Sequence, residues 1–251
     1  MVYVTGDCHA DFKKFSTKNF PDQKGMTRGD IVIVCGDFGL WNGSNDEDWW
    51  LKWLNNKPFT TVFVDGNHEC FDRLYSDEFK IVDFHGGKAH KIRSHIYHLM
   101  RGYIFEFDGK KFWAFGGAKS HDISDGIIDR DNYPDNQSFL DDIKLWSIYR
   151  REFRINHVSW WKEELPSQEE MDFGLKTLEE NGNKVDYIIT HCCPQEIATV
   201  NGFYEADVET MYFNQIAHTV QFDKWYFGHY HDNRQTYIKF VMLYDRIERI
   251  V

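Results

Sequence analysis

Short runs of apolar, mostly β-branched residues alternate along the chain with segments whose apolar residues recur at helical spacing. Three of these runs, at residues 2–5, 31–35 and 60–64, predict strands. Because the runs lack the alternating polar positions of a half-exposed strand, we expect both faces of each strand to be buried.

Capping signals predict where two helices begin. In each, a serine precedes a glutamate by three residues and an apolar stretch follows, the pattern of a capping box. The two signals are Ser44-x-x-Glu47, before the apolar residues 49–54, and Ser167-x-x-Glu170, before a helix that Gly182 should end. A further helix is expected around residues 138–153.

The middle and the tail of the chain have the pattern of antiparallel strands. Residues 104–107 and 111–115 flank Asp108-Gly109, a dipeptide typical of tight hairpin turns. Residues 236–243 and 247–251 are interpreted as another strand pair. Strand–helix alternation followed by hairpins favours an α/β sandwich of two mixed sheets flanked by helices. With no repeat and no linker, residues 1–251 are expected to form a single domain.

Composition narrows the choice of function. The 251 residues carry a formal charge of −11, and 17% of them are aromatic, which argues against disorder and against a general coat for duplex DNA. No apolar run approaches the roughly 20 residues of a membrane span, and residues 1–7 lack a signal sequence. Five cysteines without zinc-ribbon spacing indicate a reduced chain. We therefore expect a cytoplasmic protein.

Five predicted strands end in polar residues of similar chemistry. In an open α/β sheet, the carboxyl ends of the strands line the ligand crevice, so these side chains should converge there. Carboxylate, amide and imidazole groups together suit a pair of divalent metal ions. The five segments are Gly6-Asp7-Cys8-His9, Gly36-Asp37-Phe38-Gly39, Gly66-Asn67-His68-Glu69, Thr190-His191-Cys192 and Gly228-His229-Tyr230-His231. In the last of them, alternation along an extended chain would place both imidazoles on one side.

This ordered set resembles the calcineurin-like metallophosphoesterase superfamily, from Asp7 to His231. The resemblance implies a sandwich of two mixed sheets and a site with two divalent ions, Mn or Fe foremost and Zn as a further candidate. It assigns Asp7, His9 and His231 to the first ion, Asn67, His191 and His229 to the second, and Asp37 to the bridge between them. His68 would be the catalytic residue that protonates the leaving oxygen or stabilises the transition state.

The same resemblance implies the reaction. A hydroxide that bridges the two metals would attack the phosphorus of a phosphate mono- or diester, and the metals would neutralise the charge that develops on its oxygens. The substrate would be a phosphoester, with a nucleotide or a short RNA among the candidates. The alternative to an enzyme is a binding scaffold that keeps the fold without the chemistry, but a scaffold usually loses a ligand, and this chain retains the whole proposed set.

The chain departs from the phosphoprotein phosphatases of this superfamily. Those enzymes carry Gly-Asp-x-x-Asp-Arg-Gly at the second motif, where Leu40 stands here in place of the second aspartate. They also carry Arg before Gly-Asn-His-Glu, where this chain has Asp65. The groups that orient His68 and grip phosphate are therefore missing from their usual places, which argues against a serine/threonine protein phosphatase.

A second resemblance is to RNA lariat debranching enzymes, across roughly residues 30 to 122. It rests on Gly36-Asp37-Phe38, on Gly66-Asn67-His68-Glu69, on Ile96-Tyr97-His98-Leu99 and on the segment from Gly116 to Asp122. Debranching enzymes have Cys where this chain has Asp7. We therefore expect a more general relative, with a debranching-like or nucleotide phosphodiesterase as the alternative activity.

Substrate choice is expected to reside in residues 117–166. The loop at 116–122 is either merely mobile or a phosphate-binding loop, in which Lys119, Ser120 and His121 would contact the substrate. Arg130 is a further candidate for phosphate, or else a member of a surface ion pair. Trp160 and Trp161 are interpreted as core rather than as a stacking surface. The acidic residues Glu163, Glu164, Glu169 and Glu170 are interpreted as a solvated face.

Overall fold

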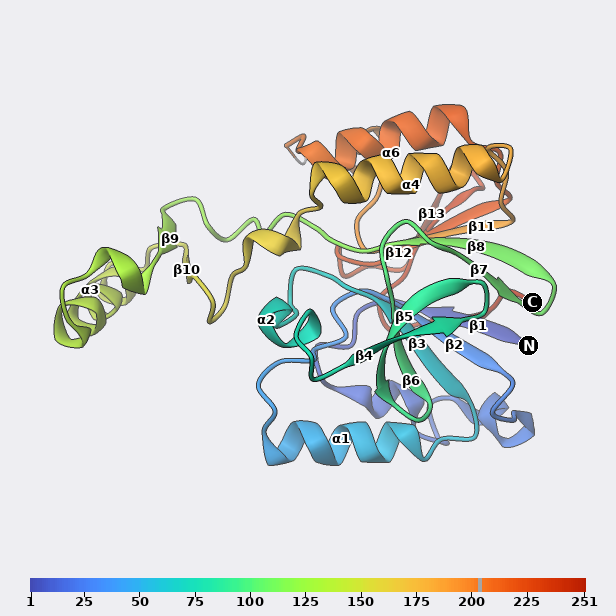
Figure 1. Ribbon diagram of the computed structural model, residues 1–251, viewed down its shortest axis with the longest axis horizontal. Coiled ribbons are helices and arrows are strands. Elements are labelled where there is room, and N and C mark those ends of the chain that lie inside the picture. The colour runs from blue at the N-terminus through green and yellow to red at the C-terminus, as the bar shows by residue number, and fades with distance from the viewer. Residues whose placement is uncertain (203–204) are drawn as a thin grey trace.

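Two mixed sheets lie face to face with helices on their outer sides, as Figure 1 shows for a computed structural model that describes residues 1–202 and 205–251. The first sheet has seven strands among the described residues, in the order β15-β1-β2-β3-β6-β5-β4. Its strands are β1 (Val2–Thr5), β2 (Ile31–Cys35), β3 (Thr60–Val64), β4 (Lys80–Phe84), β5 (Gly87–Arg93), β6 (Ile96–Leu99) and β15 (Ile247–Arg249). The strands β1, β2 and β3 have the predicted bounds.

The second sheet has six strands within the described ranges, in the order β13-β14-β12-β11-β8-β7. They are β7 (Ile104–Phe107), β8 (Lys110–Phe115), β11 (Tyr187–Thr190), β12 (Lys224–Phe227), β13 (Arg234–Thr236) and β14 (Phe240–Met242). The antiparallel pair β7–β8 confirms the predicted hairpin. The α/β sandwich of two mixed sheets is confirmed as well.

The buried apolar residues form three layers that explain this stacking. One layer, which includes Val4, Ile33 and Phe112, lies between the sheets. A second packs the outer face of the first sheet against α1 (Asn45–Asn55), and a third packs the outer face of the second sheet against α4 (Gln168–Glu180) and α6 (Val208–Thr219). Strands covered on both faces need no polar positions, as the apolar runs predicted.

The helix starts follow the capping signals, with one difference. The predicted capping box at α4 is complete: the Ser167 hydroxyl accepts from the backbone N–H of Glu170, whose carboxylate accepts from that of Ser167. At α1 only the serine half forms, because the Glu47 carboxylate accepts instead from the N–H groups of residues 41–43. The short helices α2 (Phe71–Leu74) and α5 (Gln195–Gly202) complete the flanking layers.

Two further expectations are corrected. The tail does not form one strand pair, because β14 pairs with β13 in the second sheet while β15 crosses to pair with β1 in the first. The helix expected around residues 138–153 is α3 (Asn136–Ile148), which ends earlier because residues 153–155 form the strand β10 (Phe153–Ile155).

A projecting arm, defined here as residues 126–155, contains α3 and the parallel pair of β9 (Gly126–Ile128) and β10. Figure 1 shows it extending away from both sheets, at the left of the view. Leu140, Leu145 and Ile148 of α3 are exposed.

Candidate metal centre

The polar segments meet where the ends of strands from both sheets converge. Asp7 and His9 follow β1, Asp37 follows β2, and Asn67 and His68 follow β3 in the first sheet; His191 follows β11, and His229 and His231 follow β12 in the second. The first three strands run parallel to one another, as do the last two. Parallel strands present their carboxyl ends at one edge, so the fold itself collects these side chains.

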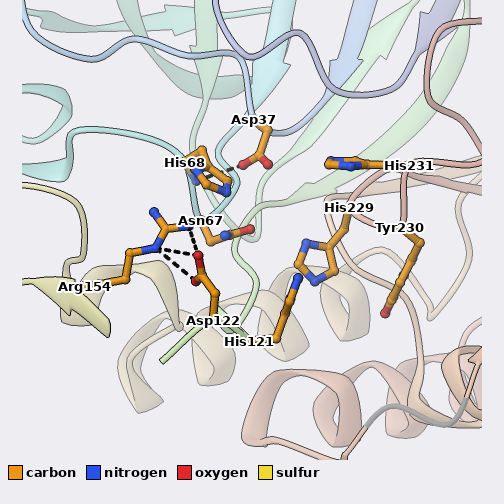
Figure 2. A pocket seen from close by; sticks show the side chains of 9 residues that line it. All are labelled: Asp37, Asn67, His68, His121, Asp122, Arg154, His229, Tyr230 and His231. Carbon is orange, nitrogen blue, oxygen red and sulfur yellow. Dashed lines mark hydrogen bonds and ion pairs between the residues drawn. The ribbon is translucent and has the colours of Figure 1, made fainter. Parts of the chain in front are cut away.

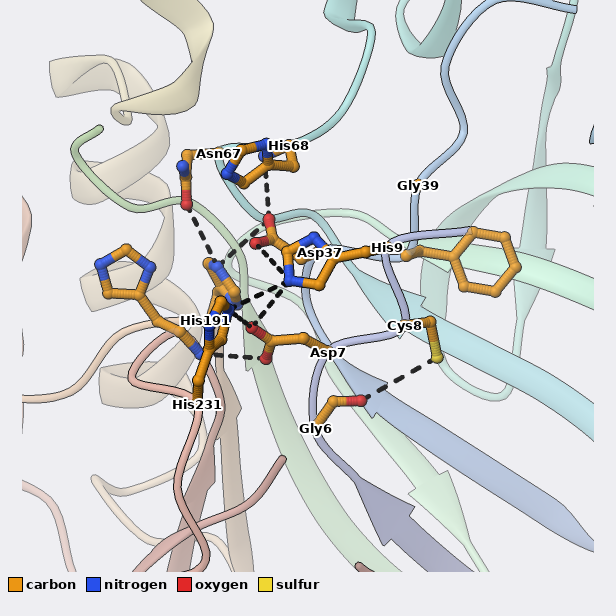
Figure 3. A network of polar contacts seen from close by, with 12 residues as sticks. Gly6, Asp7, Cys8, His9, Asp37, Gly39, Asn67, His68, His191 and His231 are labelled. Atoms are coloured by element: carbon orange, nitrogen blue, oxygen red, sulfur yellow. Dashed lines mark hydrogen bonds and ion pairs between the residues drawn. The ribbon is translucent and has the colours of Figure 1, made fainter. Parts of the chain in front are cut away.

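One group of donor atoms surrounds a single point. One ligand atom each from Asp7, His9, Asp37 and His231 lies within 4.8 Å of all the others. The Nε2 atoms of His9 and His231 are 3.1 Å apart, and His231 Nε2 is 3.1 Å from Asp7 Oδ2 (Figure 3). Two imidazole nitrogens and carboxylate oxygens at such spacing form a donor set that fits a divalent transition metal.

Asp37 faces a second group of donors with its other oxygen. Its Oδ2 is 3.7 Å from His9 Nε2, while its Oδ1 is 3.3 Å from His191 Nε2 (Figure 3). Asn67 Oδ1 lies 3.3 Å from the same His191 nitrogen, and the ring of His229 is 5.0 Å from that of His191. The two oxygens of one buried carboxylate therefore point to two separate donor groups.

The tautomer of His191 suits metal binding. Its Nδ1–H donates to the carbonyl oxygen of Cys35 at 2.8 Å, which leaves Nε2 as the nitrogen available to a metal. Burial lowers the pKa of His191, but the carboxylates of Asp37 and Asp7 outweigh it and raise that pKa to about 10. Burial likewise opposes ionisation of Asp37, yet His191 holds the pKa of Asp37 at about 2. Without metal, a proton on His191 thus balances part of the carboxylate charge.

The backbone turns sharply at the donors. The backbone φ angle is positive at four of these residues, between 45° and 67°: His9, Asp37, His229 and His231. Residues other than glycine rarely adopt this conformation. This corrects the expectation of an extended chain at residues 229–231: the two imidazoles converge through left-handed turns. The close packing also explains the glycine at position 36, because a Cβ there would lie 2.1 Å from His191 Nδ1.

Behind the donors, two buried carboxylates hold the loops. Glu69 is fully buried and accepts from the N–H groups of Phe38, at 2.6 Å, and Leu40, at 2.9 Å, which fixes the loop that carries Asp37. Glu164 accepts from Ser120 N–H at 2.8 Å and from Ser120 Oγ at 2.7 Å, and Asn67 Nδ2 donates to the same hydroxyl at 3.3 Å. The prediction that the acidic residues 163–170 form a solvated face is therefore wrong for Glu164, which is buried. Burial raises the pKa of its carboxyl to about 7.

A polar pocket of about 200 Å³ lies over the donors. Figure 2 shows His121, Asp122 and Arg154 on its far side from Asp37 and His231. Arg154 Nη2 donates to Asp122 Oδ2 at 2.7 Å. The segment just before the arm and the strand β10 within it therefore both contribute to this pocket.

The four candidate substrate residues differ in where they lie relative to this pocket. His121 lines the pocket, and its ring is 5.6 Å from that of His229. Lys119 and Ser120 line a neighbouring cavity, and Ser120 is 1% exposed and accepts from Asn67 Nδ2. Arg130 lies in the arm, where it donates to Asn136 Oδ1 and to the carbonyl of Tyr133.

The family model for calcineurin-like phosphoesterases matches residues 1–233. The chain belongs to the calcineurin-like phosphoesterase family. Members are metal-dependent hydrolases that act on phosphoester bonds, which agrees with the predicted family and with the cluster of Asp and His donors. A curated relative is lariat debranching enzyme A of Xenopus laevis, 26% identical over 149 residues. The match spans 53% of this chain and 26% of the relative, so the chain covers about a quarter of that protein's length.

Within this family, the two departures from protein phosphatases have structural explanations. Leu40, in place of an aspartate, is fully buried in the core beside α1. Asp65, in place of an arginine, is also fully buried; its Oδ2 accepts from Arg101 Nε at 3.0 Å, and its Oδ1 lies 2.9 Å from His98 Nε2. Burial opposes the ionisation of Asp65, but Arg101 outweighs it and lowers the pKa of that carboxyl. Both positions therefore stabilise the fold in this member of the family.

Arg154 is a pocket residue that was not predicted from the sequence. Its signal is the alternation Phe153-Arg154-Ile155, which marks a short strand with the arginine on the opposite face from its neighbours. No local pattern marks Glu164, because only the folded chain shows which member of an acidic cluster is buried. Trp161 is buried, as expected, and Cys8, Cys192 and Cys193 are buried as well. Among the described residues, no helix combines the length and apolarity that crossing a membrane requires.

Proposed function

We propose that this chain hydrolyses a phosphate mono- or diester with the help of two divalent metal ions. The observation that carries the proposal is the position of Asp37, whose two oxygens face His9 Nε2 on one side and His191 Nε2 on the other, at 3.7 and 3.3 Å. A carboxylate placed between two donor groups is the arrangement that a bridged metal pair requires.

The proposed ligands divide between the two groups. Asp7, His9 and His231 would hold one ion, Asn67, His191 and His229 would hold the other, and Asp37 would contact both. The mixture of nitrogen and oxygen donors suits Mn, Fe or Zn. When bound, the ions would activate a water as the nucleophile and neutralise charge on the phosphoryl oxygens.

His68 is the proposed catalytic residue of the chain itself. Its backbone N–H donates to Asp37 Oδ1 at 2.8 Å, which fixes its position beside the donors. Burial lowers the pKa of His68, so near neutral pH its imidazole is uncharged and keeps one ring N–H. That N–H would donate to the leaving oxygen and stabilise the charge that develops there.

The pocket of Figure 2 is the proposed phosphate-side wall of the site. Arg154 and His121 supply N–H donors there, and Asp122 holds the guanidinium in place. These residues belong to the region 117–166, which we assign to substrate choice. We propose Arg154 as an arginine that contacts a phosphate oxygen, because it lines this pocket; a phosphate contact by Arg130 stays a prediction.

A phosphodiester of a nucleotide or a short RNA is the second candidate substrate. The similarity to a lariat debranching enzyme favours it. Asp7 and the retained ligand set favour an enzyme over a non-catalytic scaffold.

Turnover of p-nitrophenyl phosphate and bis-p-nitrophenyl phosphate by metal-stripped protein reloaded with Mn²⁺ tests the proposal. His68→Ala should lower kcat by about 10²-fold or more, on the order expected for the loss of one donor to a developing oxyanion, with its metal content unchanged. His218→Ala, an exposed histidine paired with Glu196, is the matched control and should behave like wild type. Asp37→Ala should lose both ions. A fully loaded protein that cleaves neither ester would contradict the proposal.

A further inference from the structure

A second cavity meets the donor atoms on the other side of His68. It encloses about 400 Å³, and His9 and His68 line one end of it. The remaining lining is dominated by the half-buried indoles of Trp41 and Trp50. Because His68 lines both this cavity and the pocket of Figure 2, the two open onto one reaction centre from different sides.

The loop that carries Trp41 is fixed by a buried carboxylate. Glu47 Oε2 accepts from the backbone N–H groups of Trp41 and Asn42, each at 2.8 Å, and of Gly43 at 3.2 Å. Arg73 Nη1 donates to the other oxygen, Oε1, at 2.8 Å. These contacts hold the loop in place before any ligand arrives, which reduces the entropy lost on binding.

Both indoles are also supported from behind. The Trp41 ring packs edge-on against Trp161, with centroids 5.2 Å apart, and Trp50 packs against Phe12 and Trp53. The centroids of Trp41 and His68 are 6.5 Å apart. A flat ring carried by the ester group of a phosphate beside His68 would therefore lie close to the indole.

The side chains that line the cavity indicate which kind of chemical group it can bind. Indoles bind flat aromatic rings through stacked or edge-on contacts. The rim carries the exposed side chains of Asn42 and Asp46, an amide and a carboxylate that can exchange hydrogen bonds with a heterocycle. The exposed carboxylate of Asp46 disfavours a second phosphate group by charge repulsion.

We propose that this cavity binds a flat aromatic ring carried by the ester group of the substrate. The proposal rests on the proposed function, since the phosphate must lie at the metal donors for the ring to reach Trp41. It makes aryl and nucleoside esters the preferred substrate class, over esters of small aliphatic alcohols.

Equilibrium binding to the Mn²⁺-loaded protein tests the proposal without turnover, because phosphonates are not hydrolysed. Phenylphosphonate should bind about tenfold more tightly than methylphosphonate, the gain expected of one aromatic contact. Trp41→Ala should remove this difference and leave methylphosphonate binding unchanged, and Trp41→Phe should restore most of it. Trp49→Ala is the matched control, because Trp49 lies on α1 next to Trp50, has 56% of its surface exposed and does not line the cavity.

The outcomes separate the two proposals. Equal affinities for the two phosphonates in wild type would overturn the aromatic subsite while leaving the phosphoesterase proposal intact, and this comparison needs no variant. If neither phosphonate binds and no ester is cleaved, both proposals fail. The phosphonate analogue of AMP distinguishes the sources of the ring: tighter binding than phenylphosphonate indicates a nucleoside, and weaker binding indicates a simple aryl group.

Discussion

Replacing Glu164 with glutamine should change how the stability of the protein depends on pH. The side chain of Glu164 is 2% exposed and accepts two hydrogen bonds from Ser120. Burial raises the pKa of its carboxyl from 4.5 to about 7. Glutamine has the same shape as the protonated acid and keeps a hydrogen-bonding atom in place of each carboxyl oxygen, but it does not titrate.

The size and sign of this change in stability follow from the linkage between proton binding and folding. Between pH 4.5 and 7 the folded protein holds a proton on Glu164 that the unfolded chain releases, so the free energy of unfolding falls as the pH rises through this window. A pKa rise from 4.5 to about 7 corresponds to a loss of ~3 kcal/mol, complete above the folded-state pKa. Glu164→Gln removes this loss, so the variant should gain stability relative to wild type as the pH rises.

Urea unfolding followed by circular dichroism, from pH 4 to pH 8 on metal-stripped protein, measures the effect. The difference in unfolding free energy between variant and wild type should change by ~3 kcal/mol across this range. Glu169→Gln makes the same chemical change at an exposed position of α4 and should follow the wild-type curve. A difference curve for Glu164→Gln that stays flat to within about 0.5 kcal/mol would refute the reasoning, because burial would then not control this carboxyl.

Three further predictions concern charges around the site. Asp65→Asn should lower the free energy of unfolding by about 3–5 kcal/mol, because it leaves the buried Arg101 charge unpaired. Asp122→Asn, at the half-exposed pair with Arg154, should lower the same free energy by less than about 1 kcal/mol, and urea unfolding measures both. Metal loading at pH 7.5 should release about one proton, because His191 has a pKa of about 10 in the metal-free site. Calorimetric titration in buffers of different ionisation enthalpy detects that proton, and an enthalpy independent of buffer would count against it. Lys14→Met should lower both the stability and the metal affinity of the protein, because Lys14 Nζ donates to the carbonyl oxygens of Asp7 and Tyr244, each at 2.6 Å, and so joins the first and last loops of the site. Urea unfolding and metal analysis after dialysis against a chelator measure the two effects. Unchanged values would show that the two loops keep their positions without Lys14.

The strands that carry the donors were predictable because their apolar runs are continuous and their ends are marked by glycine and polar residues. The boundaries of β1, β2 and β3 are those predicted, and the donors follow them directly. The tail was not predictable in the same way. Strands of three residues, such as β14 and β15, carry too little pattern to indicate their partners, and the sheet that each joins depends on contacts made by the rest of the chain.

The positions of single polar side chains were harder to predict than the strands. Glu47 has the spacing of a capping residue, but three backbone N–H groups of the preceding loop compete for its carboxylate and bind it instead. Glu164 belongs to an acidic run that resembles a solvated surface, yet it is buried through its contact with Ser120. Such choices depend on donors brought close by folding, which no local spacing reveals.

The left-handed backbone at four of the proposed ligands has a consequence for sequence drift. Each non-glycine residue in this conformation costs about 1 kcal/mol or more, and His9, Asp37, His229 and His231 all adopt it. Glycine at any of these positions would relieve that strain while deleting a donor atom. Selection for a more stable fold alone would therefore tend to dismantle the proposed site, and the chain carries these four donor side chains at a cost in the stability of its fold.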